Sequence, residues 1–234
     1  MMVTDMMFIT IKPKKKMKRI NYFVMLAAAA LMAGCGQGGK PVLEPKVEQT
    51  VLVGHFHNTD DVPEYVILFN EDTGEELANV PVKDGVFRYD IPSDKTTLMS
   101  VRFGQDDNGW KENFVPTGDT VRYEIDGLKT VAEEFAPETS LNFQVRDSAP
   151  ILADVLSRLE TDSAATGELR DICLKLIEEH PSDFLGYWGL IYASLAQVTE
   201  EEWLALVDKV APEIQAKPRV QALKAQYAAS REEK

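Results

Sequence analysis

Cysteine is scarce in this chain, whose 234 residues include only Cys35 and Cys173. Because no Cys-x-x-Cys pair occurs, the sequence offers no candidate for dithiol redox chemistry. Histidine is nearly as scarce, with three residues, and none stands at motif spacing from a serine, so a serine hydrolase has no support. These absences predict a protein that is not an enzyme, because nothing assembles a nucleophile, a base and an orienting group.

Basic charge is also in deficit, since 25 Lys and Arg against 38 Asp and Glu give a net charge of −13. Six of the basic residues precede residue 20, so the rest of the chain is more acidic still. An acidic surface repels nucleic-acid phosphates and anionic lipid headgroups. We therefore expect no nucleic-acid partner, and membrane contact only through a covalent lipid.

A long apolar run is missing too, because the apolar stretch at residues 22–32 is shorter than the roughly 20 residues that span a bilayer. A basic segment precedes this stretch, and Ala33 and Gly34 follow it directly before Cys35. This order is typical of an export signal, here predicted over residues 1–34. Its end resembles the lipobox of bacterial lipoproteins, in which the cysteine becomes the lipidated N-terminus.

We therefore expect Cys35 to be lipidated and residues 35–46 to form a tether rich in glycine and proline. The predicted location is the cell envelope, with the lipid in the outer membrane rather than the inner one. Because no acidic cluster follows the cysteine, a periplasm-facing position is favoured over surface display. Two alternatives stay open: Met17 as the true start, and an ordinary cleaved signal that leaves Cys35 as a free thiol.

Residues 47–128 alternate apolar and polar side chains in seven short runs rich in β-branched and aromatic residues. Turn signals such as Asp84-Gly85 and Asp126-Gly127 separate the runs, and no helical pattern intervenes. This spacing predicts an antiparallel β-sandwich. We expect its strands within residues 50–58, 64–70, 76–82, 86–91, 97–103, 110–116 and 120–126.

Residues 129–234 switch to a period of 3.6, which predicts a small bundle of about five helices. The fold class is therefore an all-β part followed by an all-α part. Pro150 either kinks the first helix or splits it in two. Ser182 is a natural N-cap for the third helix, and Thr199 with Glu202 has the spacing of a capping box. We expect the helices within residues 140–160, 166–180, 182–197 and 199–210, and after Pro218.

Cys173 falls on the apolar face of the second predicted helix, together with Leu169, Leu176 and Ile177. A reactive thiol needs exposure and basic neighbours, and this face supplies neither. We interpret Cys173 as a small buried hydrophobic residue.

Two segments carry a family resemblance: "VPVKDGVFRYDI" at residues 80–91 and "ENFVPTGDTVRYEIDG" at residues 112–127. They resemble the DUF4369-type domain, a β-sandwich that opens many lipid-anchored thiol:disulfide interchange proteins of Gram-negative bacteria. Residues 180–226 are similar to the helical linker that follows this domain. In that family the helices lead into a thioredoxin-like domain with a Cys-x-x-Cys pair, which this sequence, ending at Lys234, lacks. The resemblance implies the fold and the envelope location, and it does not imply the redox activity.

Phe184, Trp188 and Tyr192 recur at i, i+4 and i+8 on the third predicted helix. Such a stripe is usually core, and the alternative is a partner-binding face left open where a further domain would otherwise cover it. With the family scaffold kept and the redox pair missing, we expect a non-catalytic, lipid-anchored accessory or protein-interaction module. Its partner would be a protein of the cell envelope.

Asp106, Asp107 and Trp110 lie in a polar loop that suggests a different function, that of a lipoprotein binding a small ligand or a glycan. The tryptophan would serve as a stacking platform for a sugar. The loop lacks the alternating acids and the distant glutamate of a calcium site. The bland interpretation is a charged hairpin tip with one aromatic side chain pointing inward.

His55 and His57 stand at i and i+2 of a predicted strand, which places both imidazoles on one face. Such a pair can chelate zinc or copper, but a tight site needs a third ligand. Asp60, Asp61 and His180 are the residues considered for that role, and none has diagnostic spacing. We therefore expect a solvated strand face, with no metal and no cofactor.

Overall fold

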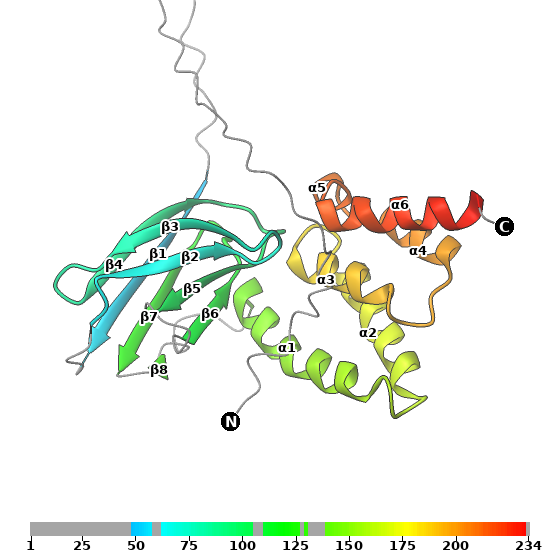
Figure 1. The fold of residues 1–234 in the computed structure, drawn as a ribbon, viewed down its shortest axis with the longest axis horizontal. Helices are drawn as coiled ribbons and strands as arrows, with labels where there is room; N and C mark the ends of the chain where they lie inside the picture. Colours follow the sequence, from blue (N-terminus) through cyan, green and yellow to red (C-terminus); the bar gives the residue numbers. More distant parts are fainter. Residues whose placement is uncertain (1–47, 58–61, 105–109, 127–128, 131–138, 233–234) are drawn as a thin grey trace, which may run out of the picture. The chain divides into compact units, whose positions relative to one another are not determined.

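The computed structural model describes residues 48–57, 62–104, 110–126, 129–130 and 139–232. These residues belong to one compact unit that begins at Val47. Within it the strands come first and the helices follow, which confirms the predicted order of a β part and a helical part (Figure 1). No helix in the described ranges is long and apolar enough to cross a membrane. The predicted lipidation site, Cys35, lies outside the described residues.

Each of the seven predicted runs overlaps one strand to within a few residues at either end, and a further two-residue strand extends the β part past residue 128. The strands form two four-stranded sheets. Sheet A has the order β4-β1-β7-β8, and sheet B has the order β3-β2-β5-β6. The bounds are β1 Gln49–His57, β2 Tyr65–Asn70, β3 Glu75–Pro81, β4 Val86–Pro92, β5 Met99–Phe103, β6 Trp110–Phe114, β7 Thr120–Asp126 and β8 Lys129–Thr130.

The prediction of purely antiparallel pairing is wrong for one pair of strands, because β1 and β7 run parallel. All pairs in sheet B, and the other pairs in sheet A, are antiparallel. Parallel neighbours need a long crossover connection. The chain between β1 and β7 supplies it, because it forms β4 and all four strands of sheet B on the way. This pairing places His55 and Glu124 side by side in register.

The predicted turn at Asp84-Gly85 is confirmed. Both residues have positive φ, 51° for Asp84 and 74° for Gly85, as a two-residue hairpin turn of the primed type requires. Lys83 and Val86 close the turn through two backbone hydrogen bonds of 2.8 and 2.9 Å. The turn carries the chain from β3 of sheet B to β4 of sheet A.

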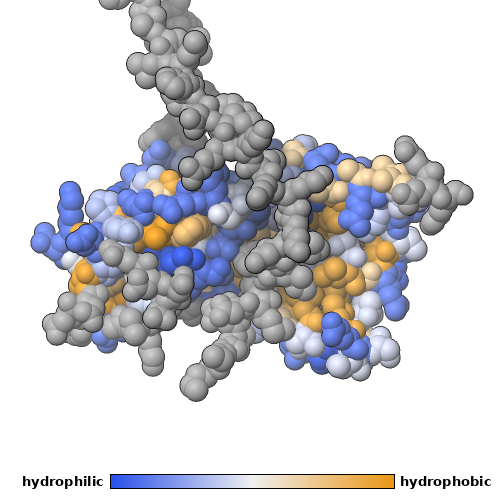
Figure 2. Space-filling view, in the orientation of Figure 1, coloured by the Kyte–Doolittle hydropathy of each residue, from blue (hydrophilic) through white to orange (hydrophobic). Residues whose placement is uncertain are grey.

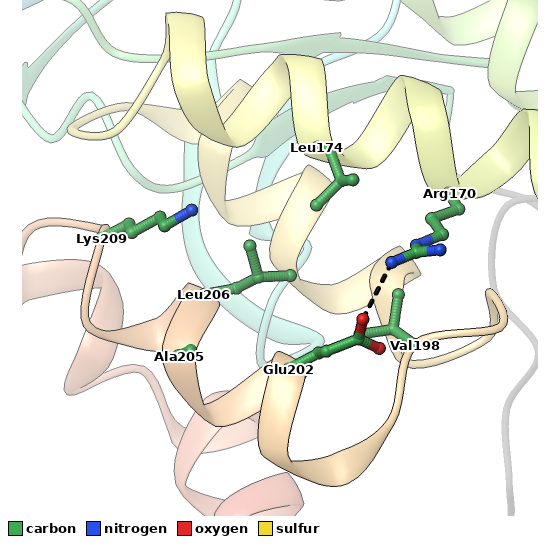
Figure 3. Close-up of a pocket in the computed structure, with 7 residues that line it drawn as sticks. All are labelled: Arg170, Leu174, Val198, Glu202, Ala205, Leu206 and Lys209. Atoms are coloured by element: carbon green, nitrogen blue, oxygen red, sulfur yellow. Dashed lines mark hydrogen bonds and ion pairs between the residues drawn. The ribbon is translucent and has the colours of Figure 1, made fainter.

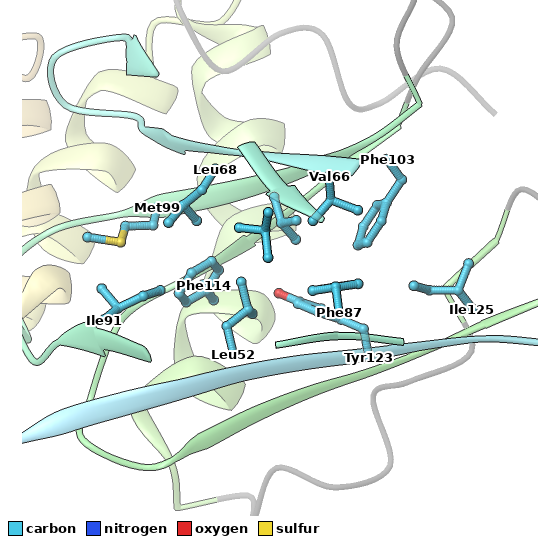
Figure 4. Packing of buried hydrophobic residues seen from close by; sticks show 12 residues of the cluster. Leu52, Val66, Leu68, Phe87, Ile91, Met99, Phe103, Phe114, Tyr123 and Ile125 are labelled. Atoms are coloured by element: carbon cyan, nitrogen blue, oxygen red, sulfur yellow. The ribbon is translucent and has the colours of Figure 1, made fainter. Parts of the chain in front are cut away.

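One cluster of buried hydrophobic side chains contains residues from both sheets (Figure 4). Each fully buried Leu, Val or Phe side chain stabilises the fold by about 1.5–3 kcal/mol. Gly54 makes room for one of them, because a Cβ at this position would lie 2.1 Å from the ring of Phe87. The cluster comprises Leu52, Phe87, Ile91, Tyr123 and Ile125 from sheet A with Val66, Leu68, Val80, Met99, Val101, Phe103 and Phe114 from sheet B.

Six helices follow in the described part of the chain. The first continues through Pro150 as a single helix, so the two-helix alternative is wrong. The capping box of Thr199 and Glu202 is confirmed by both of its hydrogen bonds. The bounds are α1 Leu141–Arg158, α2 Ala165–Glu179, α3 Phe184–Ala193, α4 Glu200–Val207, α5 Pro212–Gln215 and α6 Pro218–Glu232.

The predicted N-cap of α3 is wrong by one residue, because Asp183 and not Ser182 caps the helix. Asp183 has extended backbone, and its side chain accepts a hydrogen bond of 3.0 Å from the amide of Leu185. Ser and Asp are equally good N-caps, so preference alone could not decide. The amide of Phe184 donates to the carbonyl of Lys95 in the β part, which holds the first helical residue at that position.

Polar contacts join the β part to the helical part. The Asn142 side chain of α1 accepts from the amide of Val115 at 2.6 Å and donates to its carbonyl at 2.9 Å. Lys217, between α5 and α6, is half-buried and reaches back to the β2–β3 turn, where its ammonium lies 2.9 Å from the Asp72 carboxylate. The same ammonium also donates to the Thr97 hydroxyl. Residues 145 positions apart are thus held together by one ion pair.

Candidate functional site

A cluster of two histidines and one glutamate lies on the outward face of sheet A. Leu52 and Gly54 of β1 are buried on the core side, so the alternate residues Val53, His55 and His57 face outward. This confirms the prediction that both imidazoles share one face. Glu124 of β7 pairs in register with His55, so its carboxylate lies beside the two imidazole rings.

The three side chains offer one ligand atom each, and these atoms all lie within 4.8 Å of one another. The Glu124 Oε2 atom is 2.6 Å from Nε2 of His57 and 3.5 Å from Nδ1 of His55. The glutamate side chain is 24% exposed, and the two histidine side chains are 38% and 52% exposed. Solvent and solutes can therefore reach the cluster.

The contact with His57 has an electrostatic effect on the carboxylate. The hydrogen bond between the His57 ring and the carboxylate lowers the pKa of Glu124 below its ordinary value, with a smaller contribution from the charge of His55. Glu124 is therefore ionised at neutral pH. A carboxylate and two imidazole nitrogens form a donor set that suits zinc, copper and other transition metals.

Glu124 is the third member of the cluster, and the sequence alone did not identify it. Of the residues considered earlier, Asp60 and Asp61 lie outside the described residues. His180 sits at the end of α2, with its Nδ1 atom 3.0 Å from Asp183. Only the parallel register of β1 and β7 brings Glu124 to His55, and no local pattern signals a pairing across 67 or more residues.

The proposed ligand loop is not assembled as a stacking platform in the described residues. The Trp110 indole packs on the ring of Phe103, with centroids 5.0 Å apart and planes at 28°. One face of the indole is therefore already covered by the core. Its ring nitrogen is buried and has no hydrogen-bond partner among the described residues. Asp106 and Asp107 fall outside those residues.

The aromatic stripe of α3 belongs to the core of the helical part. Phe184 is 2% exposed and Trp188 is 8% exposed, and their ring centroids lie 5.1 Å apart. Tyr192 continues this row of rings with an edge-to-face contact, its centroid 6.1 Å from that of Trp188. In the folded chain the first two rings are not available to a partner, so the core interpretation fits the structure better than the open face.

Cys173 is buried on α2, as its place on an apolar helix face predicted. Burial raises the pKa of its thiol to about 12, because the thiolate would lose its hydration. The residue is therefore an un-ionised, inaccessible thiol at neutral pH, which gives it no nucleophilic role.

A small hollow between α2 and α4 was not foreseen from the sequence (Figure 3). Its volume is about 220 Å³, below the 300–1,000 Å³ range typical of ligand pockets. Leu174 and Leu206 form apolar walls, and an ion pair of 2.9 Å between Arg170 and Glu202 closes one end. We interpret the hollow as a gap in helix packing.

A scan against protein-family models and a search of curated proteins both return no match for this chain.

Proposed function

We propose that this chain is a lipid-anchored protein of the bacterial cell envelope that acts as an accessory or protein-interaction module without catalysis. The observation that carries the proposal is the order of its parts: a basic segment, a short apolar stretch, Ala33-Gly34-Cys35, and then a compact unit from Val47. That order is typical of an exported lipoprotein and not of a cytosolic enzyme. The folded unit would face the periplasm, with its lipid in the outer membrane.

The fold supports the proposed family relationship. Two sheets that share one hydrophobic cluster are consistent with a β-sandwich, and a set of short helices follows it. We therefore retain the DUF4369-type relationship as a proposal for residues 47–128, with the helical linker after them. The buried, protonated thiol of Cys173 and the lack of a Cys-x-x-Cys pair support a role outside redox catalysis.

The tether sets how far the folded unit can reach. Residues 36–46 separate Cys35 from the unit, and a fully extended chain gains at most about 3.5 Å per residue. The unit would then stay within about 40 Å of the membrane surface. An accessory protein held in this way meets partners that are themselves membrane-bound or pass close to the membrane.

A Cys35→Ala variant tests the anchor. We expect the wild-type chain to sediment with membranes and to begin, by intact mass, at a diacylated Cys35, whereas the variant is released into the soluble periplasmic fraction. A wild-type chain that is soluble, or a mature N-terminus without a lipid, would show that the signal is an ordinary cleaved one.

The interaction itself is tested by in-cell crosslinking of a C-terminally tagged chain followed by mass spectrometry. Hydrophilic side chains dominate the visible face, with hydrophobic patches between them (Figure 2). Ile151 and Leu195, 52% and 49% exposed, are the best surface positions for variants, because Phe184 and Trp188 are buried and their loss would unfold the chain. We expect one envelope protein to be enriched, and to be lost with Ile151→Asp or Leu195→Asp. No enriched protein from a membrane-bound wild-type chain would refute the accessory role.

A further inference from the structure

The cluster of His55, His57 and Glu124 has no part in the function proposed above. Two imidazoles from one strand and one carboxylate from the neighbouring strand bring a ligand atom each within 4.8 Å of the others. We propose that these three side chains bind one divalent transition metal ion, zinc or copper(II), on the outward face of sheet A.

The backbone fixes the three positions before any metal arrives. His55 and His57 are two residues apart on β1, so their side chains project from the same side of the sheet. Glu124 lies beside His55 on the central pairing of sheet A, which continues from Val51 and Thr120 to His57 and Asp126. Ligands on paired central strands need no backbone movement to converge, which lowers the entropic cost of binding.

Two of the three separations between ligand atoms can be compared with those around a coordinated ion, and the third, between the two imidazoles, is at most 4.8 Å. Zinc binds imidazole nitrogen and carboxylate oxygen at about 2.1 Å, so ligand atoms of a tetrahedral site lie about 3.4 Å apart. The separation between His55 Nδ1 and Glu124 Oε2 is 3.5 Å, which already fits. The separation of 2.6 Å between His57 Nε2 and Glu124 Oε2 is a hydrogen bond, and an ion that replaced the shared proton would widen it slightly. A side-chain rotation supplies that movement, since both groups are partly exposed.

The chemistry of the donors selects the class of metal. Imidazole nitrogen suits zinc, copper, nickel and iron, whereas calcium and magnesium prefer sites built from oxygen ligands. Three protein ligands leave at least one position for water, which the exposure of the cluster allows. Asp126, exposed and in register with His57, adds a nearby negative charge that favours a cation.

The experiment is a zinc titration of the full chain, purified in detergent after treatment with a chelator and carrying a C-terminal tag without histidine. Calorimetry should give one zinc per chain, with magnesium producing no comparable heat. We expect His57→Ala and Glu124→Gln each to weaken binding at least about tenfold, the loss that even an outer-shell partner causes. Glu75→Gln, which removes an exposed carboxylate on β3 outside the cluster, should leave the affinity unchanged.

Nuclear magnetic resonance of the imidazole groups provides an internal control, because the chain has three histidines and only two belong to the cluster. We expect zinc to shift the ring signals of His55 and His57 and to leave those of His180 in place. Absence of binding, equal affinity in the Glu124→Gln variant, or a shift confined to His180 would overturn the proposal. Circular dichroism of each variant would verify that the surface substitutions leave the fold intact.

Discussion

At the scale of single residues, Asp94 in the loop between β4 and β5 shows how hydrogen bonds can outweigh the effect of burial on a carboxylate pKa. Burial alone would raise the pKa of Asp94, since it removes water from the carboxylate. The hydroxyl of Thr97 donates to this carboxylate at 2.5 Å, and the amide and hydroxyl of Thr96 donate at 2.9 and 2.7 Å. These donors lower the pKa of Asp94 below its ordinary value, so the ionised form is favoured in the folded chain.

Asp94→Asn should therefore make stability less sensitive to acid. A carboxylate whose pKa is lower in the folded state stabilises the fold above its unfolded pKa of about 3.9, and this contribution is lost as the pH falls through the folded pKa. We expect the variant to be less stable than wild type at pH 7 and to lose less stability between pH 5 and pH 2, as measured by denaturant unfolding across that range. Asp171→Asn, exposed on α2, is the control with the same change of charge. Parallel pH profiles of Asp94→Asn and wild type would contradict the assignment.

At the scale of secondary-structure elements, the helical part depends on a close approach of α2 and α3. Gly189 of α3 faces α2, and a Cβ added there would lie 2.8 Å from the carbonyl oxygen of Cys173 and 3.0 Å from Cβ of Leu176. Gly167, near the start of α2, has open space around the position of a Cβ. Both glycines lie within helices, but only Gly189 is needed for the close packing of α2 against α3.

Alanine at these two positions should act in opposite directions. Gly189→Ala pushes the helices apart and should lower the free energy of unfolding by about 1–3 kcal/mol. Gly167→Ala should raise it by about 0.5–1 kcal/mol, because alanine restricts the unfolded chain and favours the helix. Thermal and denaturant unfolding of both variants checks this pair. A neutral Gly189→Ala would mean that the α2–α3 contact is looser than described.

Much of this element structure could be predicted from the sequence, because it depends on local signals. The period of two located all seven main strands, and the Thr199 capping box marked the start of α4. The N-cap of α3 was missed because Ser182 and Asp183 are equivalent locally, and the backbone hydrogen bond of Phe184 to Lys95 comes from a distant segment. The parallel β1–β7 pair was missed because strand order is set by packing between distant segments. Glu124 was missed with it, since only this pairing brings it to His55.

At the scale of the whole described unit, Lys217 links the helices to the strands. Its side chain and that of Asp72 are 11% and 13% exposed, and Asp94 lies 3.9 Å from the same ammonium. Burial raises the pKa of Asp72, and the ion pair with Lys217 opposes that effect. The ammonium also lies 5.4 Å from the ring centroid of Tyr187 on α3. Loss of this one cation would leave a buried carboxylate without its partner.

Lys217→Met should lower the free energy of unfolding by about 3 kcal/mol, the cost typical of breaking a buried pair from one side. Adding Asp72→Asn to it should restore part of that stability, because the buried charge is then removed as well. Lys175→Met, an exposed position on α2, is the control and should be nearly neutral. The comparison is a double-mutant cycle by urea unfolding. Additive effects of the two substitutions would show that the ion pair does not couple the two parts.

The parallel pairing of β1 with β7 has a consequence for how the chain is made. Synthesis proceeds at about 5–20 residues per second, so β1 emerges several seconds before its partner, which follows roughly 70 residues later. Until then β1 can pair only with β4, which is synthesised earlier and lies on its other edge, and closing the longer loop to β7 is slow. The nascent chain therefore passes through a stage in which the edge of β1 that will pair with β7 is still unpaired and open to chaperones.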